Sequence, residues 1–161
     1  MRQFRRRREG TTDYRKRLAL LKSGLPRAVV RVTNRQVLIQ LTRFTKEGDQ
    51  VVAAVSSQQL AGLGWKGSGT SIPAAYLSGL LAAREAQAAG EAHAVLDIGR
   101  VTPTPGGRVF AVLKGLIDGG MEVPHSDALY PGEERIRGEH ISKATAKQVE
   151  KVSATIQEAK A

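Results

Sequence analysis

The 161 residues are enough for one compact domain, and 41% of them are apolar types, which argues against a fully disordered chain. The absence of cysteine excludes disulfide bonds and thiolate nucleophiles, and no apolar run approaches the roughly 20 residues that span a bilayer, so we expect a soluble, cytoplasmic protein. The net charge of +10 lies at one end, because residues 1–35 hold 12 Lys and Arg against 2 acidic residues whereas residues 36–161 hold 13 of each. Such a cationic block indicates a polyanionic partner, with nucleic acid the first choice and an anionic membrane the second.

The first predicted unit covers residues 1–26. Its first eleven residues carry four consecutive arginines, Arg5 to Arg8, and are expected to be extended, and disordered when the chain is unbound. A short helix is predicted after them, with Thr12 or Asp13 as its N-cap and with its end before Gly24. The arm has no amphipathic apolar face, which disfavours a membrane as its partner.

Two kinds of side chain in this unit suit RNA or DNA. Guanidinium groups form paired hydrogen bonds with phosphate oxygens, and aromatic rings stack on unpaired bases. A solvated charged tail is the alternative interpretation, but four consecutive arginines are rare on globular surfaces. The predicted contacts are Phe4, Arg5, Arg6, Arg7, Arg8, Tyr14, Arg15, Lys16 and Arg17.

Three strands are predicted next, over residues 27–33, 36–44 and 50–56, in an antiparallel meander. Alternate residues of the second strand are apolar, which predicts one buried face and one mixed, more polar face. The apolar residues are Val37, Ile39 and Leu41. The side chains expected on the open face are Arg31, Gln40 and Arg43.

Helices and one strand alternate after the meander. A glycine-rich loop over residues 62–69 leads to a helix predicted for residues 73–89, and a fourth strand is predicted for residues 92–98. The clearest helix follows, because apolar residues recur at positions i, i+3, i+4, i+7 and i+8. These residues are Val109, Val112, Leu113, Leu116 and Ile117.

The last part of the chain is more polar. Residues 124–140 are predicted to be irregular, and a charged helix over about residues 142–159 carries a narrow apolar stripe that suits docking better than a deep core. The sequence thus predicts an α/β fold: a mixed sheet with an antiparallel N-terminal meander, covering helices and an extended basic N-terminal arm. We expect a core domain over residues 27–141 and a C-terminal docking helix over residues 142–161.

The glycine-rich loop matches the G-x-G-x-x-G pattern of dinucleotide-binding proteins at residues 62–67. In those proteins the glycines form the tight turn between a strand and a helix, whereas here residues 57–61 precede them and residues 68–72 follow before the helix. A nucleotide-hydrolase phosphate loop also fails, because the required Lys and Ser/Thr are missing. We therefore expect a flexible loop that offers Trp65, Lys66 and backbone amides to RNA.

Two sets of residues permit other functions. One polar stretch holds two histidines and three acidic residues without a compact metal-ligand spacing, so we expect no metal there and interpret the acids as ion-pair partners of Arg135 and Arg137. This set is His125, Asp127, Glu133, Glu134 and His140. The carboxylates of Asp97, Asp118 and Glu122 would have to converge to form a metal-dependent nuclease. That enzyme and a DNA-binding architectural protein are the alternatives to an RNA-binding structural protein.

Five long stretches carry a family resemblance. They are FRRRREGTTDYRKRLALLKSGLPR (Phe4 to Arg27), PAAYLSGLLAAREA (Pro73 to Ala86), AVLDIG (Ala94 to Gly99), PTPGGRVFAVLKGLIDGG (Pro103 to Gly120) and EVPHSDALYPGEERIRGEHI (Glu122 to Ile141). Together they cover most of the chain, in the order in which the family has them. In these stretches the sequence resembles the archaeal and eukaryotic type of large-subunit ribosomal protein eighteen, a family that binds 5S ribosomal RNA.

The resemblance implies a structural constituent of the large ribosomal subunit, with no catalytic activity, cofactor, metal or small-molecule substrate. It implies that the chain binds 5S ribosomal RNA, helps to attach it to the large-subunit RNA in the central protuberance, and lies close to large-subunit protein five. Carried over by position, the arm that threads RNA comprises Arg5 to Arg8, Tyr14, Arg15 and Arg17. The part of the meander that faces RNA comprises Arg31, Asn34, Arg35, Gln36 and Gln40.

Overall fold

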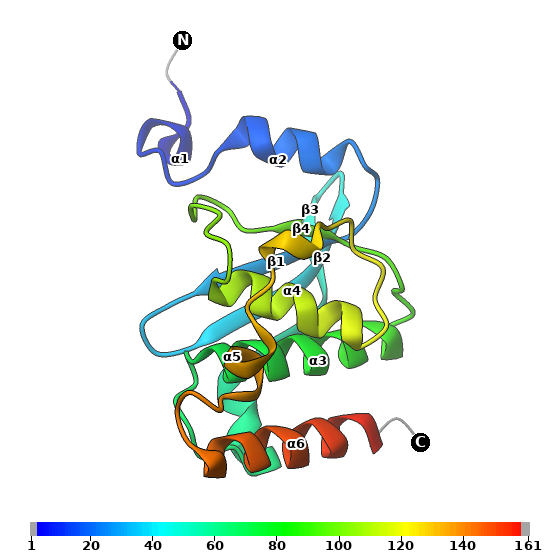
Figure 1. The fold of residues 1–161 in the computed structure, drawn as a ribbon. Helices are drawn as coiled ribbons and strands as arrows, with labels where there is room; N and C mark the ends of the chain where they lie inside the picture. The colour runs from blue at the N-terminus through cyan, green and yellow to red at the C-terminus, as the bar shows by residue number, and fades with distance from the viewer. Residues whose placement is uncertain (1–2, 159–161) are drawn as a thin grey trace.

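The protein consists of stacked layers in the computed structural model, which describes residues 3–158 (Figure 1). Helices α1 (Arg5–Arg8) and α2 (Tyr14–Leu21) lie on one side of a sheet, and α3 (Ile72–Ala88) and α4 (Arg108–Asp118) cover the other side. Helix α6 (Lys143–Glu158) forms the outermost layer, beyond α3. The first two residues of the predicted arm and the last residue of the predicted final helix, Ala159, fall outside the described residues. None of the helices in the described range is long and apolar enough to cross a membrane.

Within residues 3–158, four strands form one sheet in the order β3-β2-β1-β4. Strands β1 (Arg27–Val32), β2 (Val37–Thr45) and β3 (Gly48–Ser56) are antiparallel neighbours, whereas β4 (Val95–Asp97) runs parallel to β1. The predicted meander and the mixed α/β fold are therefore confirmed. Strand β4 is shorter than predicted, because the residues before it bond instead to the chain after α4: the Ala94 N–H donates to the Glu122 carbonyl at 3.0 Å.

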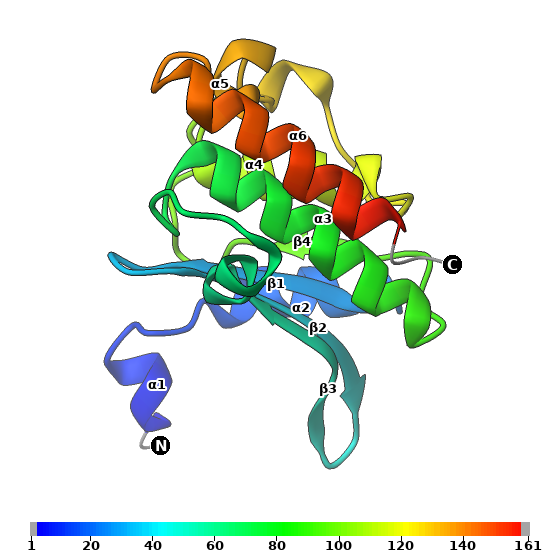
Figure 2. The same ribbon diagram turned by 90° about the horizontal axis from the view of Figure 1, so that it is seen from below.

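A β-bulge bends the outer part of the β2–β3 hairpin. Leu41 pairs with Ala53 but Thr42 pairs with Val51, so β3 has one extra residue at this point. Beyond the bulge the hairpin curls away from α3 and α4 (Figure 2). The bend brings Asp49, near the hairpin tip, into contact with α2.

The buried face of the sheet is the alternating apolar face that the sequence predicts. Val37, Ile39 and Leu41 are each at most 4% exposed, and Ala28 and Val30 of β1 lie beside them in the core. Helices α3 and α4 pack on this face, and the predicted apolar side of α4 is mostly buried. Removing this apolar surface from water is the main force that holds sheet and helices together.

Helices α3 and α4 cross at two glycines. A β carbon added to Gly115 would lie 2.2 Å from the backbone oxygen of Tyr76, and one added to Gly79 would lie 2.3 Å from the backbone oxygen of Val112. No side chain fits at either distance. The two helix backbones can therefore approach this closely only because both positions are glycine.

Three short helical elements correct the sequence analysis. A 3₁₀ helix, η1 (Ser57–Leu63), follows β3, and residues 124–140 contain the 3₁₀ turn η2 (Asp127–Leu129) and helix α5 (Glu133–Arg137) instead of being irregular throughout. Each is too short to produce a visible apolar periodicity. For η1 a readable signal does exist, the capping box formed by Ser56 and Gln59.

The apolar stripe of α6 lies deeper than the sequence analysis predicts. Val149, Val152 and Ile156 are each at most 5% exposed and belong to the same hydrophobic core as the sheet and α3. Helix α6 packs on α3 and η1. The stripe is narrow because the opposite side of α6 is open to solvent.

The N-terminal arm is not extended between residues 4 and 9, which corrects the prediction. The N–H of Arg8 donates to the Phe4 carbonyl at 3.0 Å, and the N–H of Glu9 donates to the Arg5 carbonyl at 2.9 Å, which closes one helical turn. The Arg5 and Glu9 side chains also pair at 2.8 Å, and this i,i+4 contact offsets part of the repulsion among the arginines. Helix α2 begins as predicted, because the Asp13 carboxylate accepts hydrogen bonds from the next free backbone N–H groups.

Candidate nucleic-acid interface

Helices α1 and α2 lie on the side of the sheet away from α3 and α4 (Figure 1), and most of their cationic side chains are exposed. All four arginines of α1 are exposed, as are Tyr14, Arg15 and Lys16 of α2. The ring of Phe4, immediately before α1, is 85% exposed. The segment therefore presents guanidinium groups and aromatic rings together, which is the combination that binds phosphates and unpaired bases.

Two side-chain contacts, besides the backbone hydrogen bond from the Val95 N–H to the Pro26 carbonyl at 2.9 Å, hold the N-terminal segment (residues 3–26) on the rest of the protein. The Arg100 guanidinium donates to the backbone oxygen of Gly10, between α1 and α2. The Arg17 guanidinium donates to both carboxylate oxygens of Asp49 at 2.9 Å. These contacts hold α1 and α2 on this side of the sheet.

Asp49 and Asp97 connect three arginines in a row of alternating charge. Asp49 also pairs with Arg27, which donates to Asp97 at 2.6 Å. Arg31 donates to the other oxygen of the Asp97 carboxylate at 3.3 Å. Arg27 is 3% exposed and Asp97 is 6% exposed, so each buried charge depends on the other for compensation. This network joins α2, the β2–β3 hairpin, β1 and β4.

The ionisation of Asp97 is set by its neighbours. Burial acts to raise the pKa of Asp97, but the hydrogen bond donated by the Gly99 N–H and the charges of Arg31 and Arg27 outweigh it, and the pKa is lowered. The folded protein therefore keeps this carboxylate ionised at a lower pH than the unfolded chain does. Its contribution to stability is present above the ordinary Asp pKa of about 3.9 and is lost as the pH falls through the lowered pKa.

We expect Asp97→Asn to lower the free energy of unfolding by about 1–3 kcal/mol at neutral pH, because Arg27 and Arg31 lose a charged acceptor. The variant should also lose less stability than the wild type between about pH 5 and about pH 3. Denaturant titrations across this range measure both effects. The control is Asp127→Asn, whose carboxylate is 87% exposed. An acid dependence unchanged by Asp97→Asn contradicts the prediction.

The predicted RNA-facing part of the meander contains both free and engaged side chains. Asn34 and Arg35 are exposed in the turn between β1 and β2, and Gln40 is exposed on the open face of the sheet. Arg31 already donates to the buried network, and Gln36 accepts a hydrogen bond from a serine hydroxyl at 3.0 Å. The structure therefore leaves the first three side chains available for a partner.

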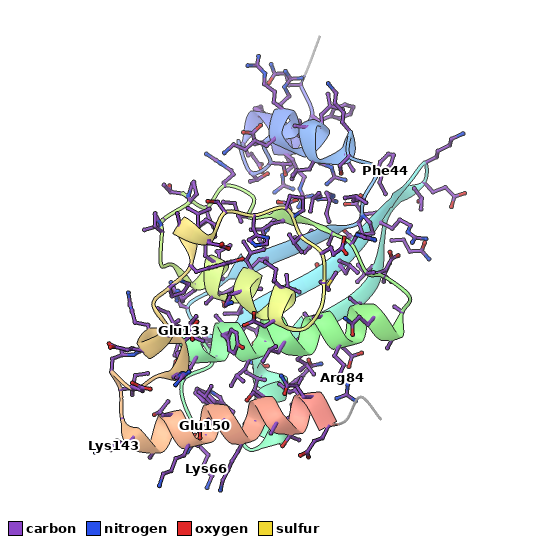
Figure 3. The ribbon with its side chains drawn as sticks, turned by 45° about the vertical axis from the view of Figure 1, so that its right-hand side comes forward. Phe44, Lys66, Arg84, Glu133, Lys143 and Glu150 are labelled. Carbon is purple, nitrogen blue, oxygen red and sulfur yellow. The ribbon has the colours of Figure 1, made fainter. Side chains whose placement is uncertain are left out.

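Trp65 and Lys66 are not close to these residues. The Trp65 side chain is 5% exposed and its Nε1 donates to the Ser68 carbonyl at 3.3 Å, so its ring is not available for stacking on bases, contrary to the prediction. Lys66 is exposed but lies beside α6, at the other end of the protein from α1 (Figure 3). Its N–H donates to Gln148 of α6 at 3.4 Å. The indole is buried because its large apolar surface fills the core between this loop and the helices.

The carboxylates considered for a nuclease do not converge. Asp97 belongs to the buried network, Asp118 accepts a hydrogen bond from the Tyr76 hydroxyl at 3.0 Å, and Glu122 pairs with His93 at 3.0 Å. Burial raises the pKa of the Tyr76 hydroxyl most, and the negative charge of Asp118 raises it further. The Tyr76 phenol therefore stays protonated. In the described part of the chain, no group of three or more His, Asp or Glu residues is placed to hold a metal ion.

The polar stretch before α6 forms fewer ion pairs than predicted. His125 lies 3.4 Å from Asp127, but among residues 3–158 neither Arg135 nor Arg137 pairs with the acids around it. Helix α5 explains the difference. Its two glutamates are in the first turn and its two arginines in the last, where each favours the helix dipole without direct contact.

Sequence reasoning missed Asp49 and Arg100, the two residues that hold the N-terminal segment. Asp49 follows Lys46, Glu47 and Gly48 and is indistinguishable from an ordinary hairpin-turn residue. Arg100 follows the turn residue Gly99 and likewise looks like an ordinary turn residue. Both act on partners at least 30 residues away in the sequence, and no local pattern indicates such a pair.

Comparisons with known proteins show the family to which the chain belongs. The sequence matches the family described as "Ribosomal large subunit proteins 60S L5, and 50S L18" over residues 1–93 and 86–126. It is 56% identical over 139 residues to large ribosomal subunit protein uL18 of Korarchaeum cryptofilum, covering 86% of this chain and 71% of that protein. The protein of the same name from Methanoculleus marisnigri is 53% identical, with 86% and 79% covered, and that from Methanoregula boonei is 46% identical, with 95% and 91% covered.

Identities of this size across most of the chain are shared only by proteins of one family, and these relatives are structural proteins of the ribosome, not enzymes. The chain therefore belongs to the uL18 family, as a structural, RNA-binding and non-catalytic constituent of the large subunit of the cytoplasmic ribosome.

Proposed function

We propose that this chain binds 5S ribosomal RNA and helps to attach it to the large-subunit RNA in the central protuberance, next to large-subunit protein five. The family resemblance in five long stretches supports the choice of RNA and of neighbour. The position of the cationic groups supports the mode of binding, in which the N-terminal segment holds the phosphates.

The observation that carries this proposal is the concentration of positive charge at the start of the chain. The whole net charge of +10 belongs to residues 1–35, and the arginines of α1 are exposed on the open side of the sheet. A segment of this kind neutralises several phosphates and releases their counterions, which makes binding strong and dependent on salt. The remaining residues are neutral as a set and contribute shape rather than attraction.

Structured RNA fits the exposed groups better than duplex DNA does. Phe4 and Tyr14 are 85% and 42% exposed, and such rings stack on bases that are unpaired. Folded RNA offers unpaired bases in loops and bulges, whereas duplex DNA keeps its bases stacked. The exposed Asn34, Arg35 and Gln40 add hydrogen-bonding groups that reach base edges and ribose hydroxyls.

A competition experiment tests this proposal. We expect the full chain to bind labelled 5S ribosomal RNA and to keep it in the presence of an excess of transfer RNA or of duplex DNA of similar length. The log–log dependence of affinity on salt should have a slope of several units, at about 0.7–0.9 per phosphate contact. Adding large-subunit protein five should give a ternary complex with a slower electrophoretic mobility than the complex of the chain with 5S RNA. Equal competition by duplex DNA overturns the assignment to 5S RNA in favour of the architectural alternative.

A further inference from the structure

A cleft of about 820 Å³ lies between the N-terminal segment and the open face of the sheet. One wall consists of α1, α2 and the residues between them. The opposite wall consists of β1, the end of β4 and the loop that follows it. The lining residues that matter for its chemistry are Arg6, Lys16, Ala19, Leu20, Val101 and Pro103.

Contacts on two sides hold the N-terminal segment over this cleft. The Arg17–Asp49 ion pair lies at α2, and the hydrogen bond from Arg100 to Gly10 lies before it. None of the eight residues of α2 is buried, although three of them are leucines. Helices with leucines on one face normally bury them against their own domain. In α2, Leu18 is 58% exposed, Leu20 and Leu21 are only half-buried, and Leu20 lines the cleft.

The polar groups that line the cleft are mostly cationic, and some have unused donors. The Arg6 and Lys16 side chains have no ion pair or hydrogen bond within residues 3–158. An anionic ligand would supply acceptors to such donors. Val101, which is 42% exposed, and Pro103 form an apolar surface in the same cleft.

We propose that this cleft binds one unpaired nucleotide of the bound RNA, with its phosphate on Arg6 and Lys16 and its base packed against Leu20, Val101 and Pro103. A nucleotide combines the two properties that the cleft requires, an anionic group and a flat apolar face. The inference rests on the proposed function, because the bound RNA supplies this nucleotide.

The size of the cleft requires that the nucleotide be unpaired. Sites of roughly 300–1,000 Å³ hold ligands of the size of a nucleotide, and a double helix does not enter them. The RNA must therefore present a base that has left its stack, which costs least at a bulge or in a loop. Proteins that recognise RNA sequence commonly take such bases, packing them against aromatic rings or guanidinium planes.

Nucleotide titrations test the two parts of the site separately. In the full chain with labelled methyl groups, we expect millimolar AMP or UMP to shift the NMR signals of Leu20 and Val101 in a saturable way. Ribose 5-phosphate and inorganic phosphate should leave these methyl signals in place. Equal shifts with ribose 5-phosphate, or no shifts with either nucleotide, overturn the base-binding site. The result does not depend on which RNA the protein binds.

Filling the cleft gives the second test. Ala19→Phe places a ring in the cleft, and we expect it to weaken binding of 5S RNA at least tenfold with an unchanged salt slope. The control is Leu18→Phe, on the same helix at a side chain that is 58% exposed and does not line the cleft, and it should bind as the wild type does. Wild-type affinity in Ala19→Phe, or equal losses in both variants, overturns the inference. A wild-type chain that does not bind 5S RNA but shows the nucleotide shifts would overturn the proposed function alone.

Discussion

Replacing Arg5–Arg8 by alanine is expected to weaken binding of the chain to 5S ribosomal RNA by about a hundredfold or more at physiological salt. All four side chains are exposed, and Arg6, Arg7 and Arg8 form no ion pair within the described residues. Each arginine that loses a phosphate contact should reduce the log–log salt slope by about one. The slope should therefore fall by about three to four. Binding isotherms at several salt concentrations measure the affinity and the slope together.

A variant with the same loss of charge at the other end of the protein is the matched control. Lys66, Lys143, Lys147 and Lys151 are exposed on or beside α6, far from α1 (Figure 3). Their replacement by alanine removes four positive charges, and we expect at most a few-fold loss of 5S RNA affinity. If both variants lose affinity equally, net charge rather than the position of the arginines explains binding. Neither variant should unfold, because these side chains bury nothing.

Much of the fold was predictable because local sequence patterns determine it. The alternation of Val37, Ile39 and Leu41 predicted the buried face of β2, and the i, i+3, i+4 pattern predicted α4. The Asp13 cap predicted the start of α2. In each case a short stretch of sequence determines which side chains leave water or which backbone group finds a partner.

The arrangement around the N-terminal segment was not predictable in the same way. The bulge after Leu41, the approach of Asp49 to Arg17 and the burial of Arg27 depend on contacts between distant parts of the chain. The exposed arginines were found because they are consecutive. The residues that hold the N-terminal segment were missed because an isolated Asp or Arg is ordinary at a turn.

Burial also reversed one prediction about binding residues. Trp65 follows a glycine and precedes a lysine, and on sequence it looks like an exposed ring suited to bases. In the folded protein the indole fills a space between its loop and the helical layers, which stabilises the fold more than an exposed position would. Exposure of a single aromatic residue depends on the whole fold, and no local pattern reports it.

Gly115→Ala is expected to destabilise the protein by about 3 kcal/mol or more, the largest effect on stability that we predict for a single methyl group. The new β carbon would lie 2.2 Å from the Tyr76 backbone oxygen and 3.0 Å from the Gly79 α carbon. These atoms belong to a helix backbone, so relief requires α3 and α4 to separate. Helix propensity favours alanine over glycine by only about 1 kcal/mol and does not compensate.

The control for this substitution is Gly62→Ala, since a β carbon at Gly62 meets no atom within 4 Å and its φ is not in the left-handed region. We expect its free energy of unfolding to stay within about 0.5 kcal/mol of the wild type in denaturant titrations. Equal stability of the two variants would mean that α3 and α4 separate at little cost. The folded fraction of Gly115→Ala should still bind 5S RNA normally, because the helix crossing and the arginines lie on opposite faces of the sheet. The arginine variant should show the converse, a stable protein that has lost its RNA, because the fold and the RNA contacts depend on different residues.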